Sequence, residues 1–536
     1  MKKHLHFISF SCLLLLSFHA QAQVTIKITD LGAVGNGTTL NTTIIQKAID
    51  SVSAIGGGTV LVSGGKFLSS TIVLKSNVTI RINAGDTLLA VSTNAAYPDY
   101  PYSSPSWNDT YTRKSLIFAQ GASNIRITGG GMINCSGLSS SFLSVSKNYR
   151  PFGVRINDCV GVKIDSVFFL TSPQWMIHVS KSKDVVIREI DIYNHGFGSN
   201  DGIDIDACEN VLIEDCNIDS NDDPIAIKTH SEVACSNVLV QNCTVATFER
   251  GVKVGNESQG PLRNIRFQNI TIKKSKTGIT LIPQTAIYVA VADGGDADSI
   301  LFDNINILTP YQTPIFIRLC DRGLNYNAGQ PKPPVKFLRN VTIQNVTAEA
   351  GSNIPISITG IPNYLAENIT LRNVFITVPG AGTATTGNIP ELETNRPEND
   401  IWGDSLPAYG LYLRHVKDIY LDSFCVTTKL PDVRPFLVSV DASNVQGDNC
   451  TNVVAGVKNI DAALSTIIFP NPAQQQVYIQ NIAAGINQIQ LLNIQGAMVK
   501  QIDTGNQPNL TINLSGMDKG LYFVGIGEKF SRLVIE

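Results

Sequence analysis

Three carboxylates in this sequence have a spacing that suits acid–base chemistry. Asp201 follows Asn200, and Asp222 and Asp223 precede an apolar run that ends at Lys228. The interval from Asp201 to Asp222 is close to the length of the repeat described below, so these acids are expected at one edge of neighbouring rungs. Hydrolysis of a glycosidic bond requires such a pair, because one carboxylic acid protonates the leaving oxygen and one carboxylate activates water.

An alternative is that the acids are ordinary turn residues. Asp before Gly is common in turns, and for Asp204 and Asp206 this explanation is as good as a catalytic one. It is weaker for the adjacent pair Asp222 and Asp223, because two charges at the entry of an apolar strand are costly. Crowding of three acids also raises the pKa of at least one of them, which keeps a proton available for catalysis.

Basic residues follow at the spacing of about one further repeat. The formal net charge of -3 gives no overall attraction to nucleic acid or to any other polyanion. An acidic substrate would therefore need a local cluster of cations, and the candidates are Lys228, Arg250 and Lys253, with Glu249 beside them. Such cations bind carboxylates through charged hydrogen bonds. The alternative for Arg250 and Lys253 is a role as solvated turn residues.

Four further residues are candidate sugar ligands. His178 and His415 are expected either to hydrogen-bond sugar hydroxyls or to be satisfied core histidines. Arg318 is expected either to clamp a carboxylate or to lie in a surface pair. Trp175 is a candidate for stacking on a sugar face, although packing near a strand start is the commoner role.

The elements that would position these residues are short, repeated strands. Each repeat has an Asn, Asp or Ser, then an alternating strand rich in Val, Ile and Thr, then a polar turn and a second strand. One coil cannot bury its own apolar face, whereas stacked coils can, with strands ~4.7–4.9 Å apart. The sequence therefore predicts an all-β, right-handed parallel β-helix with an asparagine ladder in one turn. The ladder residues are Asn77, Asn124, Asn210, Asn237, Asn264, Asn340 and Asn368.

The two ends of the chain differ from the repeat. Residues 1–22 are typical of a signal peptide, with two lysines, a short apolar run and a small-x-small cleavage site. An amphipathic helix with Asn41 as its N-cap is expected to cover the first coil of a β-helix domain over 23–455. A linker over 456–465 then leads to a small antiparallel β-sandwich over 466–536.

The cysteines do not suggest a disulfide framework. There are ten, and the loss of Cys12 with the signal peptide leaves an odd number, scattered through a long exported chain. Cys208 with Cys235, and Cys216 with Cys243, have equal separations, so each pair is expected to stack as small buried hydrophobic residues. Metal ligation is not expected, because neither a CxxC motif nor a histidine cluster accompanies them.

Several motifs resemble those of glycoside hydrolase family 28, the polygalacturonases and rhamnogalacturonan hydrolases. The matching features run from Leu31 to His415, nearly the whole predicted β-helix. They include Ser172-Pro-Gln-Trp-Met-Ile-His, Asn200-Asp-Gly-Ile-Asp and Asn221-Asp-Asp-Pro-Ile-Ala-Ile-Lys. The resemblance implies an inverting hydrolase that cleaves α-galacturonosyl linkages in an acidic, pectin-type polysaccharide, with no metal and no cofactor.

The resemblance also implies residue roles, and the chain departs from it in two places. Asp222 would be the general acid, and Asp201 and Asp223 would hold and deprotonate the water. The family's Gly-His-Gly is replaced here by Glu249-Arg-Gly, and its Arg-x-Lys by the apolar stretch at 278–282. Rhamnogalacturonan-type relatives also lack this histidine. Its absence therefore weighs more against plain homogalacturonan as the substrate than against hydrolysis as the reaction.

Residues 466–536 resemble the C-terminal sorting domain of type IX secretion cargo, through the Pro-Asn-Pro at 470–472 and Gly520-Leu-Tyr-Phe-Val. This resemblance implies recognition by the type IX secretion machinery, export through the periplasm and a secreted or cell-surface location. No nucleic-acid partner is expected. No membrane span is expected either, because no later apolar stretch is long enough. The chain is expected to act as a monomer.

Two other functions remain open from the sequence. A β-helix polysaccharide lyase would bind calcium through Asp201, Asp222 and Asp223 and use Lys253 or Arg250 as the proton abstractor. A non-catalytic surface protein would bind the glycan without turnover, which the missing histidine keeps possible. The products separate these functions, because a lyase yields an unsaturated, ultraviolet-absorbing sugar and a hydrolase yields only new reducing ends.

Overall fold

The computed structural model describes residues 24–100, 113–275, 281–324, 331–383, 388–447, 449–450, 467–469, 473–480, 482, 485–493, 497–527 and 529–535. The predicted signal peptide, the predicted linker and the Pro-Asn-Pro stretch lie outside these residues. The chain divides into two compact units, Met1–Asn452 and Val453–Glu536. Within the described ranges, no helix combines the length and the apolar character needed to cross a membrane.

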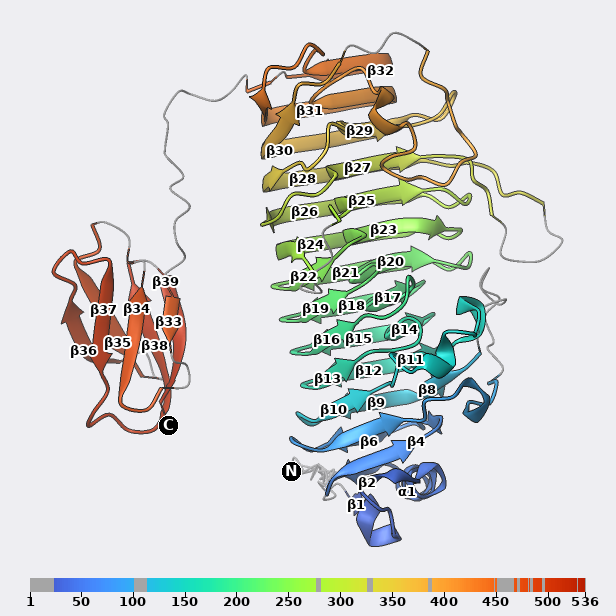
Figure 1. Cartoon of the computed structure of the whole chain (residues 1–536), viewed down its shortest axis with the longest axis vertical. Helices are drawn as coiled ribbons and strands as arrows, with labels where there is room; N and C mark the ends of the chain where they lie inside the picture. Colours follow the sequence, from blue (N-terminus) through green and yellow to red (C-terminus); the bar gives the residue numbers. More distant parts are fainter. Residues whose placement is uncertain are drawn as a thin grey trace, which may run out of the picture. The chain divides into compact units, whose positions relative to one another are not determined.

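The larger unit is a parallel β-helix, seen side-on in Figure 1. Its strands stack in three columns, and among the described residues they join into one 32-stranded sheet. Each strand pairs in parallel with its counterparts on the preceding and following coils, as in the register of Val211 with Val238 and of Val238 with Ile265. The predicted parallel β-helix is confirmed.

The first column carries the candidate site. It consists of β5 (Ile72–Val73), β8 (Ser115–Gln120), β11 (Phe152–Asn157), β14 (Ile177–Ser180), β17 (Ile203–Asp206), β20 (Ile225–Thr229), β23 (Arg250–Ser258), β25 (Thr285–Val291), β27 (Thr313–Leu319), β29 (Ile356–Thr359), the start of β31 (Leu411–Leu430) and β32 (Leu437–Gln446).

The other two columns complete each coil. The second consists of β1 (Thr25–Lys27), β3 (Gly58–Val62), β6 (Val78–Ile82), β9 (Ser123–Thr128), β12 (Val160–Asp165), β15 (Lys183–Arg188), β18 (Glu209–Glu214), β21 (Cys235–Gln241), β24 (Leu262–Lys274), β26 (Ala297–Ile307), β28 (Leu338–Glu349) and β30 (Ala366–Gly380). The third consists of β2 (Asn36–Leu40), β4 (Lys66–Ser69), β7 (Thr87–Ala90), β10 (Met132–Asn134), β13 (Phe168–Leu170), β16 (Asp191–Asn194), β19 (Asn217–Ser220) and β22 (Thr244–Thr247). From β24 onward, one long strand serves both columns.

The interior is formed by every second side chain of these strands. Val211, Val238 and Ile265 stack on successive coils and are at most 3% exposed. Burial of such apolar surface supplies the main stabilisation, roughly 25 cal/mol per Å². In the first column, β17, β20 and β25 are buried on both faces. Their outward side chains are therefore covered too, and this covered outer face holds the charged residues of the site.

The asparagine ladder is present in the turns. Asn237 Nδ2 donates to Asn210 Oδ1 at 3.2 Å, and Asn264 Nδ2 donates to Asn237 Oδ1 at 2.9 Å. The three residues have φ between 49° and 59°, a left-handed conformation that asparagine adopts more readily than most residues. The predicted structural role of these asparagines is confirmed.

A single α-helix of the described residues, α1 (Thr42–Ala54), lies at the N-terminal end of the β-helix (Figure 1). Asn41 occupies the N-cap position, as predicted, but without the expected side-chain contact. The side chain of Asn41 makes no capping hydrogen bond; its Oδ1 instead accepts from Val34 N at 2.8 Å, because the preceding segment packs against it. The apolar face is as predicted, with Ile45, Ala48, Ile49 and Val52 buried.

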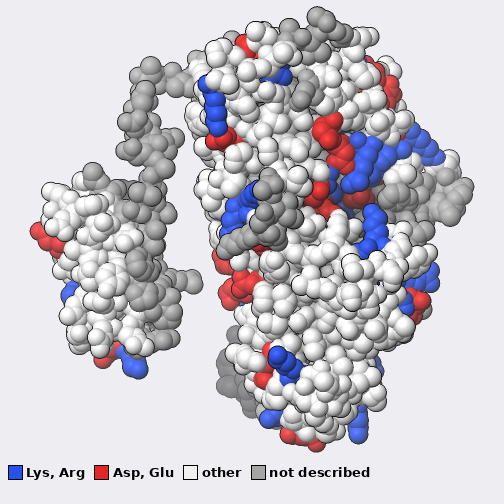
Figure 2. Space-filling view, in the orientation of Figure 1, with Lys and Arg blue, Asp and Glu red and all other residues white. Residues whose placement is uncertain are grey.

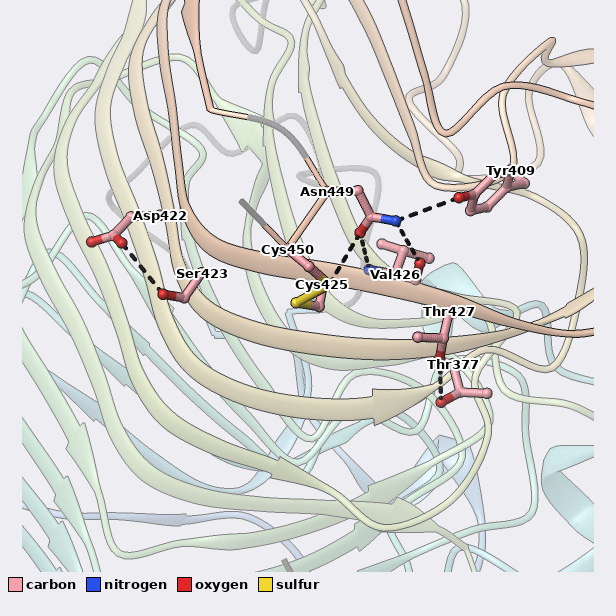
Figure 3. The surroundings of a disulfide bond; sticks show 9 residues. All are labelled: Thr377, Tyr409, Asp422, Ser423, Cys425, Val426, Thr427, Asn449 and Cys450. Carbon is pink, nitrogen blue, oxygen red and sulfur yellow. Dashed lines mark hydrogen bonds between the residues drawn. A yellow bond between two sulfur atoms is a disulfide. The ribbon is translucent and has the colours of Figure 1, made fainter. Parts of the chain in front are cut away.

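A disulfide joins Cys425 on β31 to Cys450 (Figure 3). Beside it, Asn449 Oδ1 accepts from Val426 N at 2.8 Å, and Asn449 Nδ2 donates to Val426 O at 3.1 Å. The sequence pattern did not reveal this pair. The free cysteines of the described residues are all buried, which agrees with their interpretation as small hydrophobic residues.

The smaller unit consists of two antiparallel sheets around one core. One sheet contains β33 (Ile467–Phe469), β34 (Gln476–Gln480) and β37 (Asn509–Asn513), and the other contains β36 (Met498–Asp503), β35 (Gln488–Leu492), β38 (Gly520–Ile526) and β39 (Lys529–Ile535). Val477 and Ile479 of the first sheet and Ile489, Leu491 and Val524 of the second are fully buried in this core. The predicted small β-sandwich is confirmed.

Candidate active site

The three candidate acids lie at the start of two neighbouring strands of the first column. Asp201 precedes β17, and Asp222 and Asp223 precede β20. β17 and β20 pair in parallel, and Gly202 N donates to Asp223 O at 2.9 Å, so the acids are on adjacent rungs. The side chains of Asp201 and Asp223 are 5% and 3% exposed, whereas that of Asp222 is 21% exposed. Asp222 is thus the acid with the most access to solvent.

These acids line a cleft of roughly 480 Å³ on the outer face of the column. Figure 2 shows acidic and basic side chains gathered together on this side of the β-helix. The lining comes from the coils of β11 to β27 and from a later segment near residue 400. Its charged members are Lys147, Asp201, Asp222, Asp223, Lys228, Glu249, Arg250, Lys253, Glu257, Arg322, Arg396, Glu398 and Asp400.

The pKa values of the neighbouring acids Asp222 and Asp223 are shifted in opposite directions. Burial raises the pKa of Asp222 to about 8, and the carboxylates of Asp223 and Glu249 act in the same direction. Burial also acts to raise the pKa of Asp223, but Lys253 and Arg250 outweigh it and leave that pKa below its usual value. At neutral pH the site therefore offers one protonated carboxyl beside one carboxylate, the combination that glycosidic hydrolysis needs.

Asp201 shares a buried network with Lys228. Burial, then Asp204 and Asp222, raise the pKa of Asp201 well above its ordinary value. Lys228 Nζ is 2.5 Å from Asp204 Oδ1 and 3.8 Å from Asp201 Oδ2. Lys228 is 2% exposed and lies 4.2 Å from the centre of the Trp175 ring. Its ammonium therefore pairs with carboxylates of the site, which suits a positioning role. Lys228 also lines the cleft, and its expected role as a substrate ligand stays a prediction.

Among the three candidate acids, two buried oxygens accept no hydrogen bond from the described part of the protein. Asp201 Oδ1 and Asp223 Oδ1 are buried and accept no hydrogen bond from any described residue. Both oxygens can still accept a hydrogen bond, for example from an enclosed water molecule. Within the described ranges, no group of three or more His, Cys, Asp or Glu side chains is arranged to hold a metal ion.

Lys253 and Glu257 form the next layer of charge. Lys253, on β23, is 5% exposed and its Nζ is 2.6 Å from Asp223 Oδ2. Burial opposes ionisation of Glu257, but Lys253 and Lys228 hold its pKa far below the usual range. Glu257 was not among the residues predicted from the sequence. Its signal was a second charge near Lys253 in the otherwise weakly polar segment Val252-Lys-Val-Gly-Asn-Glu, where a buried charge is costly without partners.

Arg250, at the first position of β23, is bound by carboxylates. Its Nη1 is 2.8 Å from Glu249 Oε2 and 3.9 Å from an oxygen of Asp222 and of Asp223. Its Nη2 binds Glu398. The side chain of Arg250 is only 6% exposed, so it is not the solvated turn residue that the sequence left open.

Glu398 belongs to residues 389–405, which we call the strap. The strap lies between β30 and β31, and in Figure 1 this orange segment folds back over the neighbouring coils. Arg318 Nη2 donates to the backbone oxygens of Glu391 at 3.2 Å and Leu392 at 2.9 Å, and Tyr288 OH donates to Pro397 O. These buried anchors hold Glu398 in the cleft. The repeat pattern of the sequence did not indicate these contacts.

Arg318 and His415 are therefore anchors of the strap and do not line the cleft. Arg318 is 1% exposed, and its guanidinium lies 4.7 Å from the centre of the Trp402 ring. His415 Nε2 is 3.0 Å from Glu391 Oε2, and its Nδ1 is 2.6 Å from Asp441 Oδ2. Protein groups bind most of their polar atoms, which favours the anchoring role, and their expected role in sugar binding stays a prediction.

His178 also lies outside the cleft lining. It is 2% exposed, and its Nε2 is 3.2 Å from Asp206 Oδ2, which is also 2.9 Å from His230 Nδ1. Burial lowers the pKa of His178 to about 4, although Asp206 opposes this shift. The ring packs edge-on against Trp175, with centroids 5.3 Å apart. His178 therefore fits the core alternative of the two, and it packs beside Trp175 at the edge of the cleft.

Comparison with known proteins places this site in a family. The sequence profile of glycosyl hydrolases family 28 matches residues 52–396, more than half of the chain. The chain belongs to this family. A probable polygalacturonase of Vitis vinifera is 32% identical over 216 residues, which cover 38% of this chain and 44% of the relative. This family 28 member thus spans less than half of the length of that curated relative.

Solved structures show the same fold. An exopolygalacturonase from Thermotoga maritima has 21% identity and a TM-score of 0.57, and the match covers 75% of this family 28 chain and 92% of the other. A family 28 exopolygalacturonase from Yersinia enterocolitica has 18% identity and a TM-score of 0.60, with 80% and 79% covered. At these identities the likeness establishes the β-helix fold alone.

The smaller unit has its own match. Residues 467–535 correspond to a secretion system C-terminal sorting domain, of the type IX class that the sequence pattern indicated. Such a domain directs the chain out of the cell, to the medium or the cell surface. The prediction that the chain is exported to the medium or the cell surface is therefore confirmed.

Proposed function

We propose that this family 28 chain hydrolyses α-galacturonosyl linkages in a pectin-type polysaccharide. The observation that carries the proposal is the pairing of Asp222, whose pKa is raised to about 8, with Asp223, whose pKa is lowered, in one cleft. Family membership supports it, as do the names polygalacturonase and exopolygalacturonase carried by proteins to which the chain is similar.

In the proposed mechanism, Asp222 donates its proton to the leaving glycosidic oxygen. Asp223 and Asp201 hold a water molecule through their unbonded Oδ1 atoms. Asp223, whose pKa is lowered, removes the proton of this water as it attacks the anomeric carbon, which inverts the configuration. Lys253 keeps Asp223 ionised through its contact of 2.6 Å. Lys228 balances the charge of Asp201, so that the acids can occupy adjacent rungs.

The test uses the mature full chain with fragments of homogalacturonan and of rhamnogalacturonan. We expect new reducing ends without an ultraviolet-absorbing, unsaturated product, and proton NMR of the first product should show the inverted anomer. An unsaturated product would instead establish a lyase. Tight binding of every fragment with no new reducing ends would establish a glycan-binding protein. Retention of the anomeric configuration would refute the roles given to Asp201 and Asp223.

We also propose that the chain crosses the periplasm on its way out and acts as a monomer. The signal-peptide pattern of residues 1–22 supports the first statement. The separate buried cores of the two units support the second, because neither requires a partner chain to cover its apolar residues. Cell fractionation during export and light scattering of the purified protein test these two statements.

A further inference from the structure

We propose that Glu398 is a specificity-determining residue, which excludes a carboxylate from the part of the cleft beside Arg250 and so reserves it for a neutral sugar unit. This inference rests on the proposed function and narrows its substrate class. Glu398 lies on the strap, on the Arg250 side of the acid trio, and its side chain is 22% exposed. It therefore faces whatever unit the cleft holds there.

The guanidinium of Arg250 is already occupied on its accessible sides. Nη1 is 2.8 Å from Glu249 Oε2 and 3.9 Å from oxygens of Asp222 and Asp223, and Nη2 binds Glu398. A substrate carboxylate reaches this cation only by displacing Glu398, and it would then lie beside Glu249. Like charges at such short range repel each other strongly in a site with little water.

The neighbouring cations are also held by acids of the protein. Lys253 is 5% exposed, and its ammonium is held by Asp223 at 2.6 Å. Arg396 Nε is 2.5 Å from Oε1 of the same Glu398, and Arg322 is paired with Asp293, so a substrate carboxylate must compete with Glu398 for Arg396 as it does for Arg250. A neutral sugar meets no such obstacle, because its hydroxyl groups can donate to the partly exposed carboxylates of Glu249 and Glu398. The charge pattern on this side thus rejects a uronate and accepts an uncharged ring, a repulsive form of specificity.

The other side of the cleft has the opposite character. Lys147, on the short helix η5 (Lys147–Tyr149) before β11, is exposed and lines the cleft. An exposed ammonium binds a carboxylate readily. The two ends of the cleft along the β-helix axis therefore differ in the charge that they accept. The uronate would bind toward Lys147 and the neutral unit toward Arg250. Either a methyl-esterified galacturonate or a different, uncharged sugar supplies the neutral chemistry.

The decisive variant is Glu398→Gln. Glutamine keeps the size of the side chain and an oxygen that accepts from Arg250, but it removes the charge that repels a carboxylate. The matched control is Glu393→Gln, which makes the same change on the strap at a residue that does not line the cleft. The substrates are unesterified oligogalacturonates, their methyl-esterified forms, and fragments in which galacturonate alternates with a neutral sugar.

The quantity to compare is the ratio of kcat/KM on the unesterified substrate to kcat/KM on the neutral-containing ones. We expect this ratio to rise about tenfold in Glu398→Gln, through a lower KM for the unesterified substrate with little change in kcat. Glu393→Gln should leave the ratio at its wild-type value. The two neutral-containing substrates reveal which neutral unit the wild type prefers, and a preference for either supports the proposal.

Two results overturn the inference. If the wild type cleaves these substrates and Glu398→Gln leaves the ratio unchanged, or shifts it no more than Glu393→Gln does, Glu398 does not select against a carboxylate. That outcome leaves the proposed hydrolase function intact. If the wild type cleaves none of the three substrates, the proposed function fails and the inference fails with it.

Discussion

Replacing Asp222 with asparagine tests the mechanism most directly. The asparagine would keep the shape of the side chain and the oxygen that accepts from Asp223 N at 3.1 Å, but it has no acidic proton to donate. Proton transfer of this kind contributes roughly 10²–10⁴-fold to a rate. We therefore expect D222N to lose at least about a hundredfold in kcat on any substrate that the wild type cleaves. D201N and D223N should lose a similar factor, and a double variant should be little worse than the worst single one.

The same substitution should raise stability, and the sign follows from the pKa. In the folded chain the pKa of Asp222 is about 8, against an ordinary 3.8. Between these pH values the folded state keeps a proton that the unfolded chain has released. The contribution of Asp222 to stability is therefore greatest below about pH 4 and falls as the pH rises toward about 8, by up to about 1.4 kcal/mol per pH unit. Asparagine does not titrate, so the D222N protein does not lose this part of its stability as the pH rises.

The measurement is chemical denaturation of both proteins at several pH values from about 4 to about 8. D222N and wild type should agree within about 0.5 kcal/mol at the acidic end, and D222N should become progressively more stable above it. D215N is the control, because Asp215 is exposed in a turn with φ 54°, where asparagine is equally suited. A D222N enzyme with wild-type kcat, or a stability difference that does not grow with pH, would refute the assignment of Asp222.

Three other outcomes follow from the structure. Lys253→Ala leaves the buried carboxylate of Asp223 without its partner at 2.6 Å, so we expect a loss of about 3–5 kcal/mol in unfolding free energy and a lower kcat; unchanged values would mean that Lys253 is dispensable. Replacing Cys425 and Cys450 with serine opens a loop with a sequence separation of 25, which should cost about 3 kcal/mol in urea denaturation while leaving kcat unchanged. Deleting residues 466–536 should leave a folded, active β-helix that stays inside the cell envelope, because the two units have separate cores; normal release of the truncated chain, or its unfolding, would contradict this.

The sequence by itself determined the repeat and what the repeat places together. Coils of nearly constant length put equivalent positions directly above one another, so the stacking of Asn210, Asn237 and Asn264 follows from the sequence period alone. The same periodicity put Asp201 and Asp223 on adjacent rungs. A regular period specifies neighbours one coil apart, because each strand must pair with the equivalent strand of the next coil.

Only the tertiary structure decided which residues come together across larger separations. Glu398 meets Arg250 across 148 positions of sequence, and the strap that carries it has no period from which this contact follows. His178 and Arg318 have motifs compatible with sugar binding, yet both are buried and bonded to protein groups. The physical reason is the same in each case. Hydrophobic periodicity fixes the stacked strands, whereas irregular segments settle wherever buried polar groups on distant coils find partners.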